Sequence, residues 1–162
     1  MIKLKDILLE GNPPSIFVPR RMEDRTERLI SLYIRNGNKG DLDLSGLKLT
    51  ELPEMFKDIT VGGNFYCSHN KLTSLINAPN IVAGNFGCSY NDLTSLEGAP
   101  KKVGGDFYCG FNNLTSLEGA PKSVGLNFAC SNNPVRFTEK QVRAVCYVRG
   151  VVFVWLSLNK YY

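Results

Sequence analysis

The sequence predicts a solenoid, in which short structural units stack along one axis, with short parallel β-strands as its main regular structure. Three features of the 162 residues predict it. A set of residues recurs every 21 positions in the middle of the chain, each unit contains an alternating segment typical of a strand, and the chain ends carry helical patterns instead. We therefore divide the chain into an N-terminal peptide and linker (1–21), a helical cap (22–39), the repeats (40–135) and a C-terminal cap of helix and strand (136–162).

The repeats align in columns of one residue type, each member 21 positions from the next. The columns are Phe65, Phe86, Phe107 and Phe128; Cys67, Cys88, Cys109 and Cys130; Asn70, Asn91, Asn112 and Asn133; and Val61, Val82, Val103 and Val124. Leucine fills two further columns, Leu72, Leu93 and Leu114 and then Leu75, Leu96 and Leu117, and proline fills Pro79, Pro100 and Pro121. Chance does not produce this many matching columns, so the units should share one structure.

The order within a unit, F-x-C-x-x-N-x-L-x-x-L, resembles the leucine-rich repeat, with Phe and Cys in place of the first two leucines. A degenerate unit precedes the others, with Leu42, Leu44, Leu49 and Leu52, an offset of 23 to the next unit, and Leu47 where the others have Asn. The sequence LTSLEGAP is similar to segments of repeat proteins of large tailed bacteriophages. The resemblance implies a leucine-rich-repeat solenoid with its strands on the concave face, and it says little about function because this fold serves many partners.

The chemistry of the unit agrees with such a fold. The alternation F-x-C puts both side chains on one face of a short strand, and successive strands should stack in parallel at about 4.8 Å. The Asn then turns the chain inward, where its amide can hydrogen-bond backbone groups that would otherwise be buried without partners. The stretch from Pro79 to Gly84, and its copies, should return the chain with little or no helix.

The five cysteines and the single histidine are the residues to test for chemistry. Intervals of 21 residues do not suit a metal site, which needs clustered ligands at spacings such as C-x2-C. Cysteines facing inward behave as small buried hydrophobes, so a ladder of core thiols is the favoured interpretation. Disulfides between neighbouring coils, and a metal or nucleophile role, remain alternatives. His69 is expected at the surface or in an interface, because no nucleophile can be assigned to it.

Charge is distributed unevenly along the chain. Residues 1–39 carry 8 Lys and Arg against 5 Asp and Glu, residues 40–134 carry 6 against 9, and residues 135–162 carry 5 against 1. A nucleic-acid-binding protein would concentrate positive charge on the body that presents its binding face, so nucleic acid is not the expected partner. The start MIKLKDILLE does not match a secretory signal and no run of about 18 apolar residues predicts a transmembrane segment. We expect the host cytoplasm or the virion interior as its location.

The outward strand positions predict a partner-binding face that is polar, aromatic and almost uncharged. Exposed Tyr beside Ser, Asn and Gly is typical of adaptable binding surfaces, although Tyr and Asn also simply suit exposed strands. The candidate partner-binding residues are Asn64, Tyr66, His69, Asn85, Tyr90, Asp106, Tyr108 and Phe111.

The two ends are expected to cover the apolar core of the solenoid. Residues 22–36 carry apolar residues at helical spacing and Gly37 as a stop. Thr138 to Gln141 is a capping box that opens a short helix, and Val151 to Leu158 is an expected strand. The alternatives for this strand are a homo-oligomer interface or a weak membrane contact.

The first residues allow a further resemblance. In large tailed phages, proteins bound for the capsid interior carry a short N-terminal peptide that is removed after a Leu/Ile-x-Glu sequence, usually before a small residue. Leu8 and Glu10, followed by Gly11, resemble such a processing site. The competing interpretation is a frayed terminus.

The sequence therefore favours a non-enzymatic protein-interaction module, phage-encoded, that acts on a host or phage protein through its concave repeat face and needs no cofactor. The alternative is a structural or packaged virion component. An enzyme is the least favoured class, because no catalytic constellation is visible and the 28 residues after Pro134 leave no room for a catalytic domain.

Overall fold

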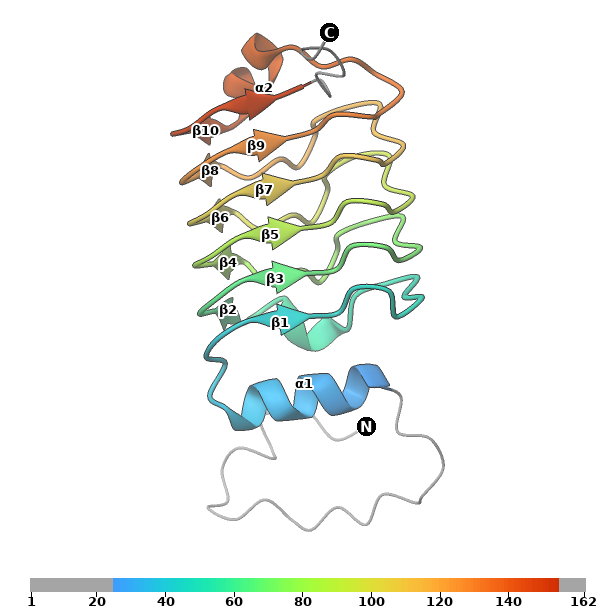
Figure 1. Cartoon of the computed structure of the whole chain (residues 1–162), viewed down its shortest axis with the longest axis vertical. Helices are drawn as coiled ribbons and strands as arrows, with labels where there is room; N and C mark the ends of the chain where they lie inside the picture. Colours follow the sequence, from blue (N-terminus) through green and yellow to red (C-terminus); the bar gives the residue numbers. More distant parts are fainter. Residues whose placement is uncertain (1–24, 155–162) are drawn as a thin grey trace, which may run out of the picture.

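The computed structural model describes residues 25–154, which form a β-solenoid of about five turns (Figure 1). A six-stranded sheet, here called sheet A, runs along one side, and a five-stranded sheet, here called sheet B, runs along another. Sheet A contains β1 (Leu42–Asp43), β3 (Phe65–Tyr66), β5 (Phe86–Gly87), β7 (Phe107–Tyr108), β9 (Phe128–Ala129) and β11 (Val152–Phe153). Sheet B contains β2 (Thr60–Val61), β4 (Ile81–Val82), β6 (Lys102–Val103), β8 (Ser123–Val124) and β10 (Tyr147–Val148).

All neighbouring strands are parallel, and their register follows the sequence repeat. Phe65 pairs with Phe86, 21 residues on, and Leu42 pairs with Phe65, 23 residues on. The degenerate first unit and its longer offset are therefore confirmed. Sheet B was not predicted. Its strands lie in the segments that return the chain from one unit to the next, such as Ile81–Val82 within the stretch from Pro79 to Gly84.

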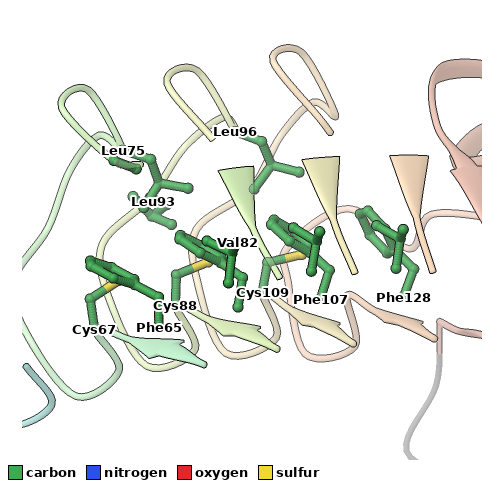
Figure 2. Close-up of a cluster of buried hydrophobic side chains, with 14 of the residues drawn as sticks. Phe65, Cys67, Leu75, Val82, Cys88, Leu93, Leu96, Phe107, Cys109 and Phe128 are labelled. Carbon is green, nitrogen blue, oxygen red and sulfur yellow. The ribbon is translucent and has the colours of Figure 1, made fainter. Parts of the chain in front are cut away.

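The core lies between the two sheets and consists of the predicted apolar columns. Figure 2 shows Phe65, Phe107 and Phe128 in one row along the solenoid axis, with the labelled cysteines beside them. The Phe65 and Phe86 rings stack at 5.5 Å between centroids and 7° between planes, and Phe86 and Phe107 stack at 5.4 Å and 7°. The column spacing in the sequence thus becomes a continuous stack of buried rings, which contributes contact energy at every turn.

All five cysteines are buried free thiols, so the predicted thiol ladder is confirmed and the disulfide alternative is not. Burial raises the pKa of the Cys88 thiol well above its ordinary value, and it raises the pKa of Cys130 to about 11. A buried neutral thiol is a poor nucleophile and a poor metal ligand, because both roles need the thiolate. These cysteines therefore fill space in the core.

The asparagine column performs the predicted backbone role. Asn91 Oδ1 accepts a hydrogen bond from the backbone N–H of Leu72 at 3.0 Å, and Asn91 Nδ2 donates to the carbonyls of Cys67 and Cys88 at 3.0 and 3.1 Å. The equivalent bonds recur one coil on either side and at the C-terminal coil, for Asn70, Asn112 and Asn133. Each amide thus ties two successive coils together where the chain turns inward.

At the first coil, α1 (Arg25–Arg35) lies against β1 (Figure 1). Ile30 and Tyr33 are buried in the same core as the repeats, and the Tyr33 hydroxyl donates to the Asn38 carbonyl at 2.6 Å. Gly37 has a left-handed φ of 69° just after the helix, as its predicted role as a stop requires. The expected start of this helix, at residue 22, falls outside the described residues.

At the last coil, α2 (Glu139–Val145) begins as predicted. The Thr138 side chain accepts from the backbone N–H of Gln141, and the Gln141 side chain accepts from the backbone N–H of Thr138 at 2.8 Å. The expected strand from Val151 is present as β11, over Val152–Phe153, and residues 155–158 of that prediction lie outside the described part of the chain. In the span 25–154, no helix is both long enough and apolar enough to cross a membrane.

Candidate functional site

The outward side of sheet A presents two tyrosines, here called the tyrosine pair, on β3 and β7. In each strand the preceding Phe points into the core, so Tyr66 and Tyr108 point outward. Gly87 lies between them on β5. A Cβ at Gly87 would stand 2.7 Å from Tyr66 Cδ1, so the Tyr66 ring lies over this glycine and occupies the space that a side chain there would need.

Both tyrosine hydroxyls have hydrogen-bond partners on the solenoid. Tyr108 Oη donates to Asp106 Oδ2 at 2.9 Å, and Asn85 Nδ2 donates to Tyr66 Oη at 3.5 Å. Partial burial, and then the hydrogen bond and charge of Asp106, raise the pKa of Tyr108 to about 12. Tyr108 nevertheless keeps 37% of its surface exposed. The pair therefore presents apolar ring surface in a fixed orientation.

A second aromatic group, here called the ring stack, follows where each coil leaves sheet A. It consists of His69, Tyr90 and Phe111, whose ring centroids lie 4.3 and 4.2 Å apart with planes 11° and 9° from parallel. Tyr90 is 45% exposed and Phe111 is 38% exposed, and His69 is exposed as well. Three consecutive coils thus form one exposed aromatic stripe along the solenoid.

All three residues of the ring stack have left-handed backbone conformations, with φ of 56°, 58° and 55°. The turn into the asparagine column imposes this geometry, and the backbone N–H of His69 donates across to the Ser89 carbonyl of the next coil at 3.0 Å. For residues other than Gly, Asn and Asp this conformation costs roughly 1–2 kcal/mol, while one stacked ring pair contributes about 0.5–1.5 kcal/mol. Three residues carry this strain and only two ring pairs offset it, so the stacking returns only part of what the backbone loses. Stability alone therefore does not account for aromatic residues here.

Asn64, Asn85 and Asp106 have a backbone role that the sequence did not reveal. The side-chain oxygen of each accepts the backbone N–H one coil further on, from Asn85 at 2.7 Å, Asp106 at 2.7 Å and Asn127 at 2.9 Å. Asp41 starts this second ladder, and its pKa is lowered by the hydrogen bond from the Asn64 backbone. The signal was available, since Asn or Asp occupies this position in every unit. Partner binding by these three residues stays a prediction.

The structure gathers the eight candidate residues on and beside sheet A. Five of them lie on its strands or directly before them: the tyrosine pair, Asn64, Asn85 and Asp106. Each member of the ring stack lies three residues after the outward strand residue of its coil, which is Tyr66, Gly87 or Tyr108. Within residues 25–154, no group of three or more His, Cys, Asp and Glu is arranged to hold a metal ion. The candidate processing residues Leu8, Glu10 and Gly11 lie outside the described residues.

An open hollow of about 590 Å³ lies among the return loops, away from the predicted face. Lys57, Lys101 and Lys122 line it together with Glu97 and small residues such as Gly98. Its mixed charge and open shape match no particular ligand class.

Comparisons with known proteins gave no match: no family model fits the chain, and neither the curated proteins nor the solved structures searched contain a significant relative.

Proposed function

We propose that the protein is a non-enzymatic interaction module, a leucine-rich-repeat solenoid that binds a protein partner through the outward face of sheet A and the ring stack. The observation that carries the proposal is the presence of exposed aromatic rings in fixed positions. The hydroxyls of the tyrosine pair have partners on the solenoid, and the ring stack is fixed by its own contacts and by the turn beneath it.

Rigid exposed rings are suited to binding because they lose little conformational freedom when a partner covers them. Tyrosine is enriched at protein interfaces because it offers a large apolar surface with one polar end. Asp106 is ionisable, but its oxygens already accept hydrogen bonds from Tyr108 and Asn127. Asp43 on β1 is exposed and pairs with Tyr66 in the sheet, so the face offers apolar ring surface with one carboxylate beside it.

In this proposal the two ends act as caps that seal the core. α1 buries Ile30 and Tyr33 against the first coil, and α2 buries Val142 at the last. The last coil still exposes Val145, Tyr147, Val151 and Phe153, so self-association through its strands is a secondary proposal. Equilibrium sedimentation at rising protein concentration tests it, and a constant monomer mass would contradict it.

From the phage resemblance we propose a partner in an infected bacterium, either a host protein or another phage protein, with the host cytoplasm or the virion interior as location. The alternative function, a packaged virion component, predicts abundant protein in purified particles. Cleavage after Glu10 would then give a mature form that begins at Gly11. Mass spectrometry of virions tests both points, and full-length protein inside heads would contradict the cleavage.

The binding face is tested by pull-down of partners from host lysate with the double variant Tyr66→Ala/Tyr108→Ala. We expect recovery of the partner to fall, because the variant removes both fixed rings. Ile81→Ala is the control, since Ile81 is a 40% exposed apolar residue on sheet B, outside both proposed surfaces. Equal recovery with the double variant and the control would contradict the proposed face.

A further inference from the structure

At the N-terminal end of the solenoid, the ring stack stops one coil short of the first repeat. The column that contains it reads Gly46, His69, Tyr90, Phe111 and Asn132, and all five residues have a left-handed φ between 55° and 69°. Gly46 makes the same backbone hydrogen bond as His69: its N–H donates to the Ser68 carbonyl at 3.0 Å, as that of His69 donates to Ser89 at 3.0 Å. The Gly46 backbone is therefore placed as if to carry a further ring, but it carries none.

The space beside Gly46 is open. Apart from the chain neighbours of Gly46, no described heavy atom lies within 4 Å of the position that a Cβ there would take. Asn132 at the opposite end of the column shows that a residue with a side chain is compatible with this conformation. Glycine in the first coil therefore leaves a gap one coil thick next to the exposed His69 ring.

The existing stack defines what fits this gap. Each ring meets the next at 4.2–4.3 Å with planes within 11° of parallel, so the gap accepts a flat ring at van der Waals distance from His69. We propose that Gly46 and His69 form a stacking site for one aromatic side chain of the protein partner, which extends the ring stack by one member. This inference rests on the proposed protein-binding function and specifies how that partner is held.

The charges near the gap disfavour a cationic occupant. Asp43 lies three residues before Gly46, and Lys48 and Lys71 lie two residues after Gly46 and His69. All three side chains are exposed, and they differ in sign. Together they carry one net positive charge, which disfavours a guanidinium. An uncharged aromatic side chain matches the uncharged rings of the stack, and a phosphate-bearing base is the competing occupant that the test below compares with it.

The site can be tested on the full chain without a known partner. The probe is N-acetyl-tryptophan amide, titrated into isotope-labelled protein while the Gly46 amide and the His69 ring are followed by NMR. We expect saturable shifts at both residues with a dissociation constant in the millimolar range or weaker, from the ring contact together with the apolar surface that it buries. Absence of saturable shifts at these residues would overturn the inference. So would tighter binding of guanidinium or of adenosine monophosphate than of the probe.

Two substitutions at Gly46 separate the ring from the backbone. Gly46→Tyr should fill the gap with the protein's own ring and weaken probe binding about fivefold to tenfold, the size of one ring contact. Gly46→Asn is the matched control, because it adds a side chain at the same φ without a ring and should leave most of the binding. His69→Ala, which removes the ring that the probe contacts, should weaken binding by a similar factor. Equal probe affinity in the parent, Gly46→Tyr and His69→Ala proteins would overturn the site.

The partner assay distinguishes this inference from the proposed function. If Gly46→Tyr reduces partner recovery while Gly46→Asn does not, the partner uses the site. If Gly46→Tyr leaves recovery unchanged while Tyr66→Ala/Tyr108→Ala abolishes it, the stacking site is refuted as a partner contact and the proposed function stands.

Discussion

The asparagine column allows a specific prediction about stability. When the Asn91 amide is removed, some of its hydrogen-bond partners keep another hydrogen bond and one does not. The carbonyl of Cys67 also accepts from Asn70 at 3.0 Å, and that of Cys88 also accepts from Asn112 at 3.0 Å. The backbone N–H of Leu72, by contrast, has Asn91 Oδ1 as its acceptor among the described residues, at 3.0 Å. Asn91→Ala thus leaves one buried donor without a partner.

An unpaired buried N–H costs about 1–3 kcal/mol, and we expect Asn91→Ala to lower the free energy of unfolding by that amount. Urea unfolding followed by circular dichroism measures it. Asn113→Ala is the control, because Asn113 is an exposed residue of the next unit, and its loss should change stability by less than about 0.5 kcal/mol. If the two variants unfold at the same urea concentration, the amide ladder does not contribute as its geometry implies.

Three further predictions follow from the core and from the tyrosine pair. Phe107→Ala should cost about 3–5 kcal/mol, measured by the same urea unfolding, because it leaves a cavity within the buried ring row; parental stability would contradict its placement. The native protein should resist a thiol reagent at pH 8 and release five thiols on denaturation, since burial raises the pKa of Cys88 and its neighbours; rapid native labelling would contradict the buried ladder. Tyr108 should ionise near pH 12, after exposed tyrosines, in an ultraviolet titration. Because its folded pKa lies above the ordinary 10.0, the folded state holds this proton more tightly, and its contribution to stability is lost as pH rises from about 10 through 12. Asp106→Asn should lower that pKa.

The stacking of the repeats could be predicted from sequence because a column of identical residues translates directly into a strand register. The Phe and Asn columns gave the buried ring row and the amide ladder, and the shifted first unit gave the pairing of Leu42 with Phe65. The start of α2 was equally accessible, since the exchange between Thr138 and Gln141 is local.

Sheet B could not be read from alternation, because each of its strands buries a single residue, the valine, whereas F-x-C in sheet A buries two alternate residues. The valine column was the available sign that these segments pair, since Val61 and Val82 are buried partners in it. The backbone role of Asn64 and Asn85 was hidden for a different reason. Their position beside outward-facing residues suggested solvent, and only the structure shows the side-chain oxygen turned back to the next coil.

The ring stack was the least predictable feature, and the reason bears on function. Its members differ in type, so no column of identical residues marks them, and aromatic residues do not ordinarily predict a left-handed turn. The same turn is made by Gly46 in the first coil and Asn132 in the last, which adopt this conformation at lower cost. The solenoid therefore does not require rings at this column. Because stacking returns only part of what the backbone loses in strain, the stability of the fold does not explain rings at this column. The proposed contact of a partner's ring with the gap at Gly46 would give their exposed surface a use.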